Sequence, residues 1–425
     1  MQLSVATNFD DALIEGIKDY PVAELYGKLS ADAVGGGRAS FMLPKVGRRR
    51  VKAHVEEAHR AGIKFNYLLN AACLNNMEYT RKGQRAIRRL LDWISGIGVD
   101  AVTVSIPFLL ETIKSDYPHL WVKVGVFAQV DSLRKARAWE AMGADAIVLD
   151  SLTVNREFAT LRAIREGTRS ELVLLANNNC LESCHISQYH MQTLSHGSQS
   201  GHATRGFMVD YCYLHCARAK LSAPVNYIRS DWIRPEDLHH YEAIGYRTFK
   251  VVERNAPTEV LVRRVKAYAE RSYDGNLLDL IQGYAYPTNG KAGAARKALL
   301  WRAHYLLRPL TINLAKLLPL KRLLTKRSML TPQEGPPPVY IDNKRLGGFM
   351  DRFLTEGCRD VDCESCRYCH RAAAEAVTME LAHRRECLSL HREVHQQLVS
   401  GEAWRYLPVK PSGGGGCGDS CSAHR

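Results

Sequence analysis

Two stretches, Gly98-Val-Asp-Ala-Val-Thr-Val104 and Gly143-Ala-Asp-Ala-Ile-Val-Leu149, share one pattern, and that pattern decides the fold. Each begins with a glycine typical of a helix end, passes through a short turn and enters a continuously apolar run. Such runs are typical of strands that are buried on both faces of a parallel sheet. Similar runs, separated by longer amphipathic stretches, predict strands at residues 3–6, 22–26, 65–70, 101–106, 122–127, 146–150, 172–177 and 249–253.

These strands, with helical patterns between them such as residues 85–94 and 133–142, predict an α/β protein with a TIM-like (β/α)8 barrel over residues 1–285. A doubly wound open sheet is the alternative. No Gly-x-Gly-x-x-Gly motif opens a helix, so nucleotide binding has no support. Barrel chemistry lies at the carboxyl ends of the strands, where this sequence places polar segments such as Asn177-Asn-Asn-Cys180.

The composition is that of a globular protein without a membrane span. No apolar run reaches the ~18 residues that cross a bilayer, and the first residues lack a basic and apolar leader. A cytoplasmic location is therefore expected. Ten of the 12 cysteines are clustered, and in a reducing compartment clustered cysteines indicate metal ligands or catalytic thiols.

The first cysteine cluster consists of two Cys-x3-Cys pairs, Cys180 with Cys184 and Cys212 with Cys216. Four thiolates complete either a 4Fe–4S cluster or a tetrahedral zinc site, and the spacing fits both. Because the first pair follows a strand end, we expect this centre at the mouth of the barrel. Histidines crowd the same stretch, as zinc ligands or as acid–base groups beside an iron–sulfur cluster: His185, His190, His196, His202 and His215.

A second cluster lies in a compact C-terminal module, residues 335–405. Its cysteines are closely spaced and predict a second iron–sulfur cluster or a structural zinc ion: Cys358, Cys363, Cys366 and Cys369. A helical pattern follows over residues 372–398. Residues 406–425 are expected to form a flexible glycine-rich tail that carries Cys417 and Cys421.

A basic segment, residues 286–334, separates the barrel from the C-terminal module. Between residues 280 and 333 there are ten Lys and Arg residues and no Asp or Glu, and leucines are interleaved with them. Such a segment suits an anionic membrane surface, contacted through residues 291–327, or phosphates. Equally, it suits a helical arm that packs on the rest of the protein with a solvated basic face. Pro309 and Pro319 are expected to divide it into short helices.

Several stretches resemble peptidase family U32. They are Phe65-Asn-Tyr-Leu-Leu-Asn-Ala-Ala-Cys73, Leu175-Ala-Asn-Asn-Asn-Cys-Leu-Glu-Ser-Cys-His185, Tyr227-Ile-Arg-Ser-Asp-Trp-Ile-Arg-Pro235 and Arg271-Ser-Tyr-Asp-Gly-Asn-Leu277. The resemblance covers about residues 1–285. It implies a TIM-barrel-like catalytic domain in which Cys180, Cys184, Cys212 and Cys216 hold a 4Fe–4S cluster.

The family takes its name from collagenase-like peptidases, but several members are oxygen-independent hydroxylases, and some of these act as pairs. The sequence lacks the family's peptidase signature, Glu-x-Phe-x-x-Gly-Ser-Leu-Cys. We therefore expect an iron–sulfur oxidoreductase that hydroxylates a small-molecule or lipid-like substrate at the inner membrane face. His190, His196 and Arg205 are the candidates for proton transfer and anion contact. An electron donor and a second U32 protein are the implied partners.

Two other functions stay open. A metal-dependent peptidase would need an open metal position and a general base, for which Glu182 is the candidate. An RNA-modifying or nucleic-acid-binding protein, the less favoured alternative, would use the basic segment to track phosphates.

Overall fold

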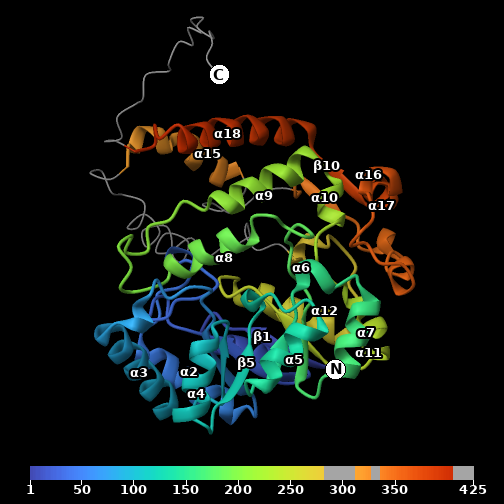
Figure 1. Cartoon of the computed structure of the whole chain (residues 1–425). Coiled ribbons are helices and arrows are strands. Elements are labelled where there is room, and N and C mark those ends of the chain that lie inside the picture. The colour runs from blue at the N-terminus through green and yellow to red at the C-terminus, as the bar shows by residue number, and fades with distance from the viewer. Residues whose placement is uncertain (282–311, 327–335, 405–425) are drawn as a thin grey trace, which may run out of the picture.

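The computed structural model describes residues 1–281, 312–326 and 336–404, and its centre is a closed barrel of eight parallel strands (Figure 1). The strands follow one another around the barrel in chain order, and β8 pairs with β1 to close it. The predicted (β/α)8 barrel is therefore confirmed, and the open sheet is wrong. The strands are β1 Gln2–Ala6, β2 Val22–Gly27, β3 Lys64–Leu69, β4 Ala101–Val104, β5 Trp121–Val124, β6 Ala146–Val148, β7 Glu171–Leu175 and β8 Thr248–Val251.

Six of the eight observed strands, β3 to β8, end earlier than the sequence predicts. β7 ends at Leu175 rather than at residue 177, and β4 ends at Val104 rather than at residue 106. Residues just beyond the ladder, such as Asn177, turn their side chains to backbone groups at the barrel mouth instead. The extra polar residues therefore belong to the mouth and not to the sheet.

Helices surround the barrel, and their apolar stripes face the strands. In α3 the buried side chains Ile87, Leu90, Leu91 and Ile94 recur at helical spacing, and the Thr80 hydroxyl caps the first turn by accepting from the amide of Gly83. The helices around the barrel are α1 Asp11–Ile17, α2 Arg48–Arg60, α3 Arg81–Gly96, α4 Pro107–Asp116, α5 Leu133–Ala141, α6 Ser151–Val154, α7 Phe158–Gly167, α11 Leu238–Ala243, α12 Thr258–Glu270 and α13 Leu278–Ile281.

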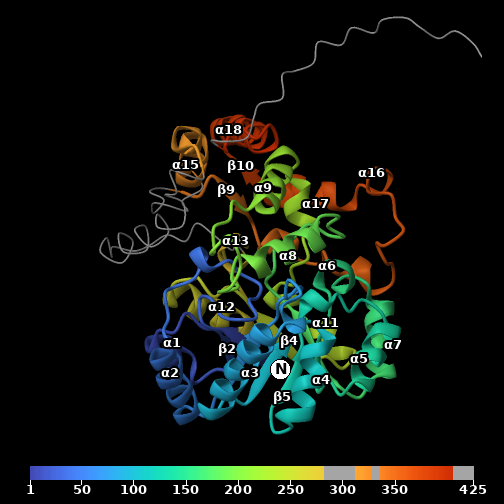
Figure 2. The same ribbon diagram turned by 60° about the vertical axis from the view of Figure 1, so that its left-hand side comes forward.

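A long insertion between β7 and β8 covers the carboxyl ends of the strands. It contains α8 Ser187–His196, α9 Tyr211–Ser222 and α10 Val225–Ile228, and Figures 1 and 2 show α8 and α9 above the barrel. Short 3-10 turns complete the described chain at Ser40–Met42, Met77–Tyr79, Val126–Ala128, Pro235–Asp237, Leu314–Leu317, Lys344–Leu346 and Asp351–Leu354.

The C-terminal region contains β9 Val339–Ile341, α16 Cys363–Cys366, α17 Tyr368–Ala376, β10 Val377–Met379 and α18 Leu381–Val399. The continuous helix predicted over residues 372–398 is wrong, because β10 interrupts it. Val377, Thr378 and Met379 pair with β9 in an antiparallel ladder, so tertiary strand pairing overrides the helical pattern. The region's Ile341, Phe349 and Phe353 belong to the same buried cluster as the barrel core.

Of the basic segment, the structure describes residues 312–326. Here α15 Leu318–Lys326 packs against α18, with Leu320 and Leu323 buried (Figure 2). The remainder of the segment and the tail with Cys417 and Cys421 lie outside the described residues. Among the helices that are described, none combines the length and the apolar character that a bilayer crossing needs.

Candidate active site at the mouth of the barrel

A cavity of about 420 Å³ opens at the carboxyl ends of the strands. Its floor includes Tyr26, Thr103 and Lys250 from the strands, and α8 and α9 of the insertion form its roof. Much of its wall is apolar, with Leu68 and Val148 among the lining residues. In a (β/α)8 barrel this end is where catalytic side chains gather.

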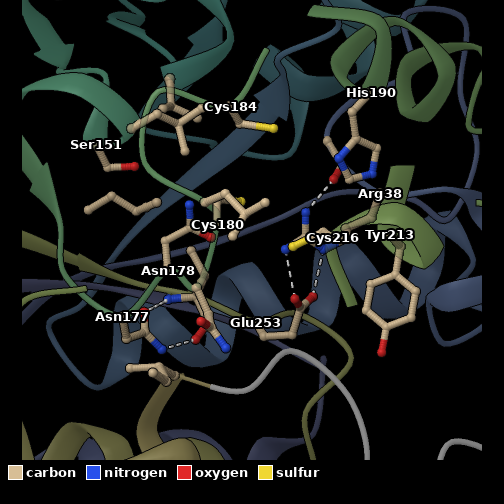
Figure 3. A pocket seen from close by; sticks show the side chains of 18 of the residues that line it. Arg38, Ser151, Asn177, Asn178, Cys180, Cys184, His190, Tyr213, Cys216 and Glu253 are labelled. Atoms are coloured by element: carbon tan, nitrogen blue, oxygen red, sulfur yellow. Dashed lines mark hydrogen bonds and ion pairs between the residues drawn. The ribbon is translucent and has the colours of Figure 1, made fainter. Parts of the chain in front are cut away.

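The four cysteines of the first cluster all line this cavity. Cys180 and Cys184 lie on the loop after β7, whereas Cys212 and Cys216 lie on α9, where their spacing of four residues places them on one helix face. Figure 3 shows Cys180, Cys184 and Cys216 around the same space. The structure thus brings together two cysteine pairs that are separated in the sequence.

In the part of the chain that the structure describes, no three His, Cys, Asp or Glu side chains already enclose a point for a metal ion. The four thiols of the first cluster share a cavity wall, but in this arrangement they do not surround a common metal centre. Their chemistry fits such a centre, because four thiolates are the donor set of a 4Fe–4S cluster or a tetrahedral zinc ion. Burial raises the pKa of Cys180 and Cys184, and it raises the pKa of Cys212 to about 12.

The carboxylate of Asp231 holds the first cysteine loop in place. It accepts hydrogen bonds from the Ser151 hydroxyl at 2.6 Å, the Asn178 amide at 2.8 Å and the backbone N–H of Cys180 at 2.8 Å. Burial raises the pKa of Asp231, and these three donors oppose the rise. The sequence analysis did not single out this residue, although it lies within the family stretch that begins at Tyr227.

Asn177 and Lys220 also hold the loop between β7 and α8 in place. Asn177 donates to the carbonyls of Val252 and Leu280 and accepts from the amide of Val252. Lys220, one turn beyond Cys216 on α9, donates to the Asn179 side-chain oxygen at 2.5 Å and to its carbonyl. The Asn-rich segment therefore holds the first cysteine loop in position.

Of the three predicted catalytic residues, the structure places only His190 on the cavity wall. Its Nε2 lies 3.2 Å from the carboxylate of Asp210, and Asp210 also caps α9 by accepting from the amide of Tyr213. His196 instead stacks on His202, with ring centroids 4.8 Å apart. Arg205, in a left-handed backbone conformation at φ 49°, does not line the cavity either.

An ion pair at the rim joins two segments that are distant in sequence. Arg38 binds both carboxylate oxygens of Glu253, at 2.8 and 2.7 Å (Figure 3). Arg38 follows the run Gly35-Gly-Gly37, and a Cβ at Gly36 would lie 2.6 Å from the side-chain oxygen of Asn70. The glycine there allows the chain to approach the mouth closely.

The second cysteine cluster lines a small pocket beside the first cysteine loop. Cys358, Cys363, Cys366 and Cys369 share this pocket with Glu182, which lies between Cys180 and Cys184. Burial raises the pKa of Cys358 to about 12 and also raises that of Cys369. Glu182, the candidate base of a peptidase, thus faces the second cluster and is not among the residues that line the main cavity.

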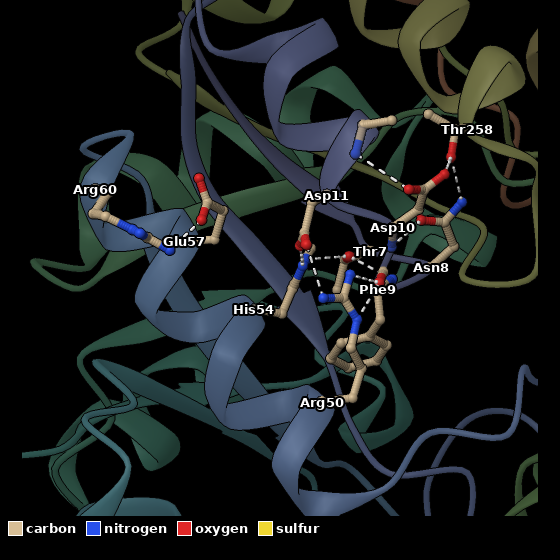
Figure 4. Close-up of polar contacts among 11 residues, drawn as sticks. Thr7, Asn8, Phe9, Asp10, Asp11, Arg50, His54, Glu57, Arg60 and Thr258 are labelled. Atoms are coloured by element: carbon tan, nitrogen blue, oxygen red, sulfur yellow. Dashed lines mark hydrogen bonds and ion pairs between the residues drawn. The ribbon is translucent and has the colours of Figure 1, made fainter.

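A chain of hydrogen bonds that resembles a hydrolytic triad lies elsewhere, just beyond β1 (Figure 4). The Thr7 hydroxyl lies 2.7 Å from Nε2 of His54, and Nδ1 of His54 lies 3.0 Å from Asp11. Thr7 is 1% exposed, and it is not among the residues that line the main cavity. This arrangement therefore joins β1 to α1 and α2 and does not face a substrate space.

Fold and cavity together define a class: a (β/α)8-barrel protein with reactive side chains gathered at the carboxyl ends of its strands. The family model of peptidase family U32 matches residues 30–271. The uncharacterized protease MJ1657 of Methanocaldococcus jannaschii is 33% identical over 347 residues, which are 82% of this chain and 86% of that protein. The chain belongs to peptidase family U32.

Solved structures with similar folds are more distant. The U32 peptidase Mk0906 is 21% identical, with a TM-score of 0.46 over 60% of this chain and 93% of its own. A chitinase from Rhizomucor miehei is 12% identical, with a TM-score of 0.35 over 64% of this chain and 100% of its own. Likenesses at this level do not bear on activity.

Proposed function

We propose that this U32 protein is an iron–sulfur enzyme of redox type, an oxygen-independent hydroxylase or a related oxidoreductase. The observation that carries the proposal is the gathering of Cys180, Cys184, Cys212 and Cys216 on one cavity wall at the catalytic end of the barrel. The nearby carboxylates are not offered as metal ligands, because Asp231 binds the first cysteine loop and Asp210 binds His190. A donor set of thiols alone lacks the histidine or carboxylate ligands of a catalytic zinc site, whereas it suits a 4Fe–4S cluster.

The chain's own residues would position and protonate the substrate. A 4Fe–4S cluster, when bound by these thiols, supplies one-electron redox chemistry. Hydrogen bonds with Asp231 and Lys220 hold the first cysteine loop in a fixed position relative to α9. His190, oriented by Asp210, is placed to give or take a proton at the cavity wall.

The apolar wall of the cavity suits a lipophilic body on the substrate. We further propose that the second cysteine cluster holds an iron–sulfur cluster or zinc and relays electrons or stabilises the C-terminal region. This second cluster shares its pocket with Glu182, which belongs to the first cysteine loop, so the second cluster lies directly beside that loop. A cytoplasmic location, contact with the inner membrane face through residues 291–327, an electron donor and a second U32 subunit belong to the same proposal.

Metal and sulfide analysis tests the assignment. Anaerobically purified protein should be brown, with absorbance near roughly 400 nm and about four iron and four sulfide ions per first-site cluster. Cys180→Ala/Cys184→Ala should lose that iron. The matched control is Cys73→Ala/Cys387→Ala, which removes two cysteines that do not line the cavity. Colourless protein with zinc at both sites would overturn the proposal.

Peptide hydrolysis is the second candidate, because the curated relative is named a protease. Four cysteine ligands would close a zinc site and leave no position for the attacking water. Peptidase activity that survives removal of iron and disappears in Glu182→Gln would favour this candidate.

A further inference from the structure

Two cations at the floor of the cavity, Lys250 and Arg254, form no ion pair with any residue that the structure describes. Lys250 lies on β8 and Arg254 follows that strand, and both line the cavity. They are 9% and 5% exposed, so each side chain is almost entirely removed from bulk water. Among the described residues, no acidic side chain lies within ion-pair distance of either, and Nη1 of Arg254 is buried without a hydrogen-bond partner.

Other charged groups around the cavity are already bound. Arg38 pairs with Glu253, and Lys326 pairs with Glu386 at 2.8 Å. Lys220 is bound by Asn179, and Asp279 accepts from the hydroxyl of Tyr273 at 2.6 Å. Arg264 also lines the cavity, and its guanidinium donates to the backbone carbonyls of Val252 and Asp279. Lys250 and Arg254 differ from these cations because their charged groups form neither an ion pair nor a hydrogen bond within the described part of the chain.

The surroundings of Lys250 oppose its positive charge. Its ammonium group lies 4.0 Å from the centre of the Tyr26 ring, which gives only a cation–π contact. Burial lowers the pKa of Lys250 to about 8, and the neighbouring cations Lys123 and Arg254 lower it too. Glu24 acts in the opposite direction, but its carboxylate is bound to Lys123 at 2.9 Å.

Uncompensated buried charges are costly, and proteins keep them where a ligand supplies the opposite charge. We propose that Lys250 and Arg254 bind an oxyanion, a carboxylate or a phosphate, carried by the substrate. The anion would occupy the barrel floor, and the rest of the molecule would extend along the apolar wall toward the cysteines. This inference rests on the proposed function in calling that molecule a substrate, but anion binding itself needs no cluster.

Binding of inorganic phosphate and of malonate, measured by calorimetry and by thermal shift at constant ionic strength, tests the proposal. Wild type should bind at least one probe. Lys250→Met and Arg254→Gln should each weaken that binding by roughly tenfold or more, since each removes one charge-assisted contact, and the double variant should abolish it. Preference for malonate identifies a carboxylate site, and preference for phosphate identifies a phosphate site.

The control is Lys326→Met, which removes one positive charge from the same cavity lining while leaving the floor intact. It should bind the preferred probe within about twofold of wild type. Failure of wild type to bind either probe would overturn the inference, as would unchanged binding by the double variant. Iron measured on the same samples separates the two proposals: anion binding by iron-free protein leaves this inference standing while the iron–sulfur assignment fails.

Discussion

At the scale of single residues, two carboxylates, Asp231 and Asp210, hold parts of the cavity wall in place. Asp231 lies beneath the first cysteine loop, where one donor from α6 and two donors from that loop converge on its two oxygens. The carboxylate of Asp210 binds both His190 and the first turn of α9. Neither residue belongs to a short motif that would make it conspicuous in the sequence, yet both decide where the thiols and the histidine lie.

Replacing Asp231 should unfold the mouth of the barrel. In Asp231→Ala the Ser151 hydroxyl, the Asn178 amide and the Cys180 N–H lose their acceptor in a buried place. The free energy of unfolding should fall by about 2–4 kcal/mol, because unsatisfied buried donors are costly. Urea denaturation measures this loss. The control is Asp274→Asn, which breaks the exposed ion pair with Lys344 and should change the free energy of unfolding by less than about 0.5 kcal/mol.

The positive charge on Lys250 should make stability depend on pH. The folded-state pKa of Lys250 is about 8, below the ordinary lysine value of 10.5, so between these values the unfolded state carries the extra proton. The unfolding free energy of wild type should therefore rise with pH across this window, by about 3 kcal/mol relative to Lys250→Met. Glu24, Lys123 and Arg254 face this lysine and are the same in both proteins. Parallel curves for the two proteins from pH 7 to 10.5 would contradict the expectation.

What the sequence could predict at this scale follows from how local each signal is. The pairs Cys180/Cys184 and Cys212/Cys216 are visible because each has a short spacing, and the αβ joints indicate that the first pair follows a strand. The partners of Asp231 lie on two other segments, at Ser151 and on the loop with Asn178 and Cys180, so no local pattern indicates it. His190 and His196 looked equivalent in the sequence, but α8 directs only His190 to the cavity.

At the scale of elements, strands buried on both faces were predictable because their signal is continuous apolar sequence. Their ends were not, since a polar residue such as Asn177 completes its backbone hydrogen bonds outside the ladder. β10 was missed for a related reason: three residues within a helical pattern form a strand only because β9 offers a partner from elsewhere in the chain. The local periodicity of a sequence does not show whether a distant segment will pair with it.

One loop attaches the second cysteine cluster to the barrel. Oε1 of Glu157, at the start of α7, accepts from the backbone N–H groups of Cys358 at 2.5 Å and Arg359 at 3.0 Å. A Cβ at Gly357 would lie 2.5 Å from the other carboxylate oxygen. Gly357→Ala should therefore displace the carboxylate and destabilise the loop by about 1–3 kcal/mol.

Hydrogen exchange at Cys358 and Arg359 measures the effect of Gly357→Ala, and exchange should become about tenfold faster or more. Gly347→Ala is the control, because its Cβ would have its nearest contact at 3.4 Å, an ordinary van der Waals distance. Equal exchange rates in both variants would show that Glu157 does not hold the loop.

At the scale of the whole molecule, the C-terminal region shares its core with the barrel. Ile341 is fully buried, and Asn276, beyond α12, binds the carbonyl of Val339 and the amide of Ile341. Arg156 of the barrel lies over the rings of Phe349 and Phe353. The boundary near residue 335 that composition suggests is thus a boundary in sequence but not in packing.

A shared core predicts that the two regions unfold together. Ile341→Ala should lower the free energy of unfolding by about 2–5 kcal/mol, because a cavity opens in that core. Its neighbour on β9, Tyr340, is exposed, so Tyr340→Ala should cost much less. Differential scanning calorimetry should record one transition in wild type, and Ile341→Ala should shift the whole of it. If the C-terminal region were independent, two transitions would appear and Ile341→Ala would move only one of them, while the barrel transition, and with it the cysteine cavity, would stay unchanged.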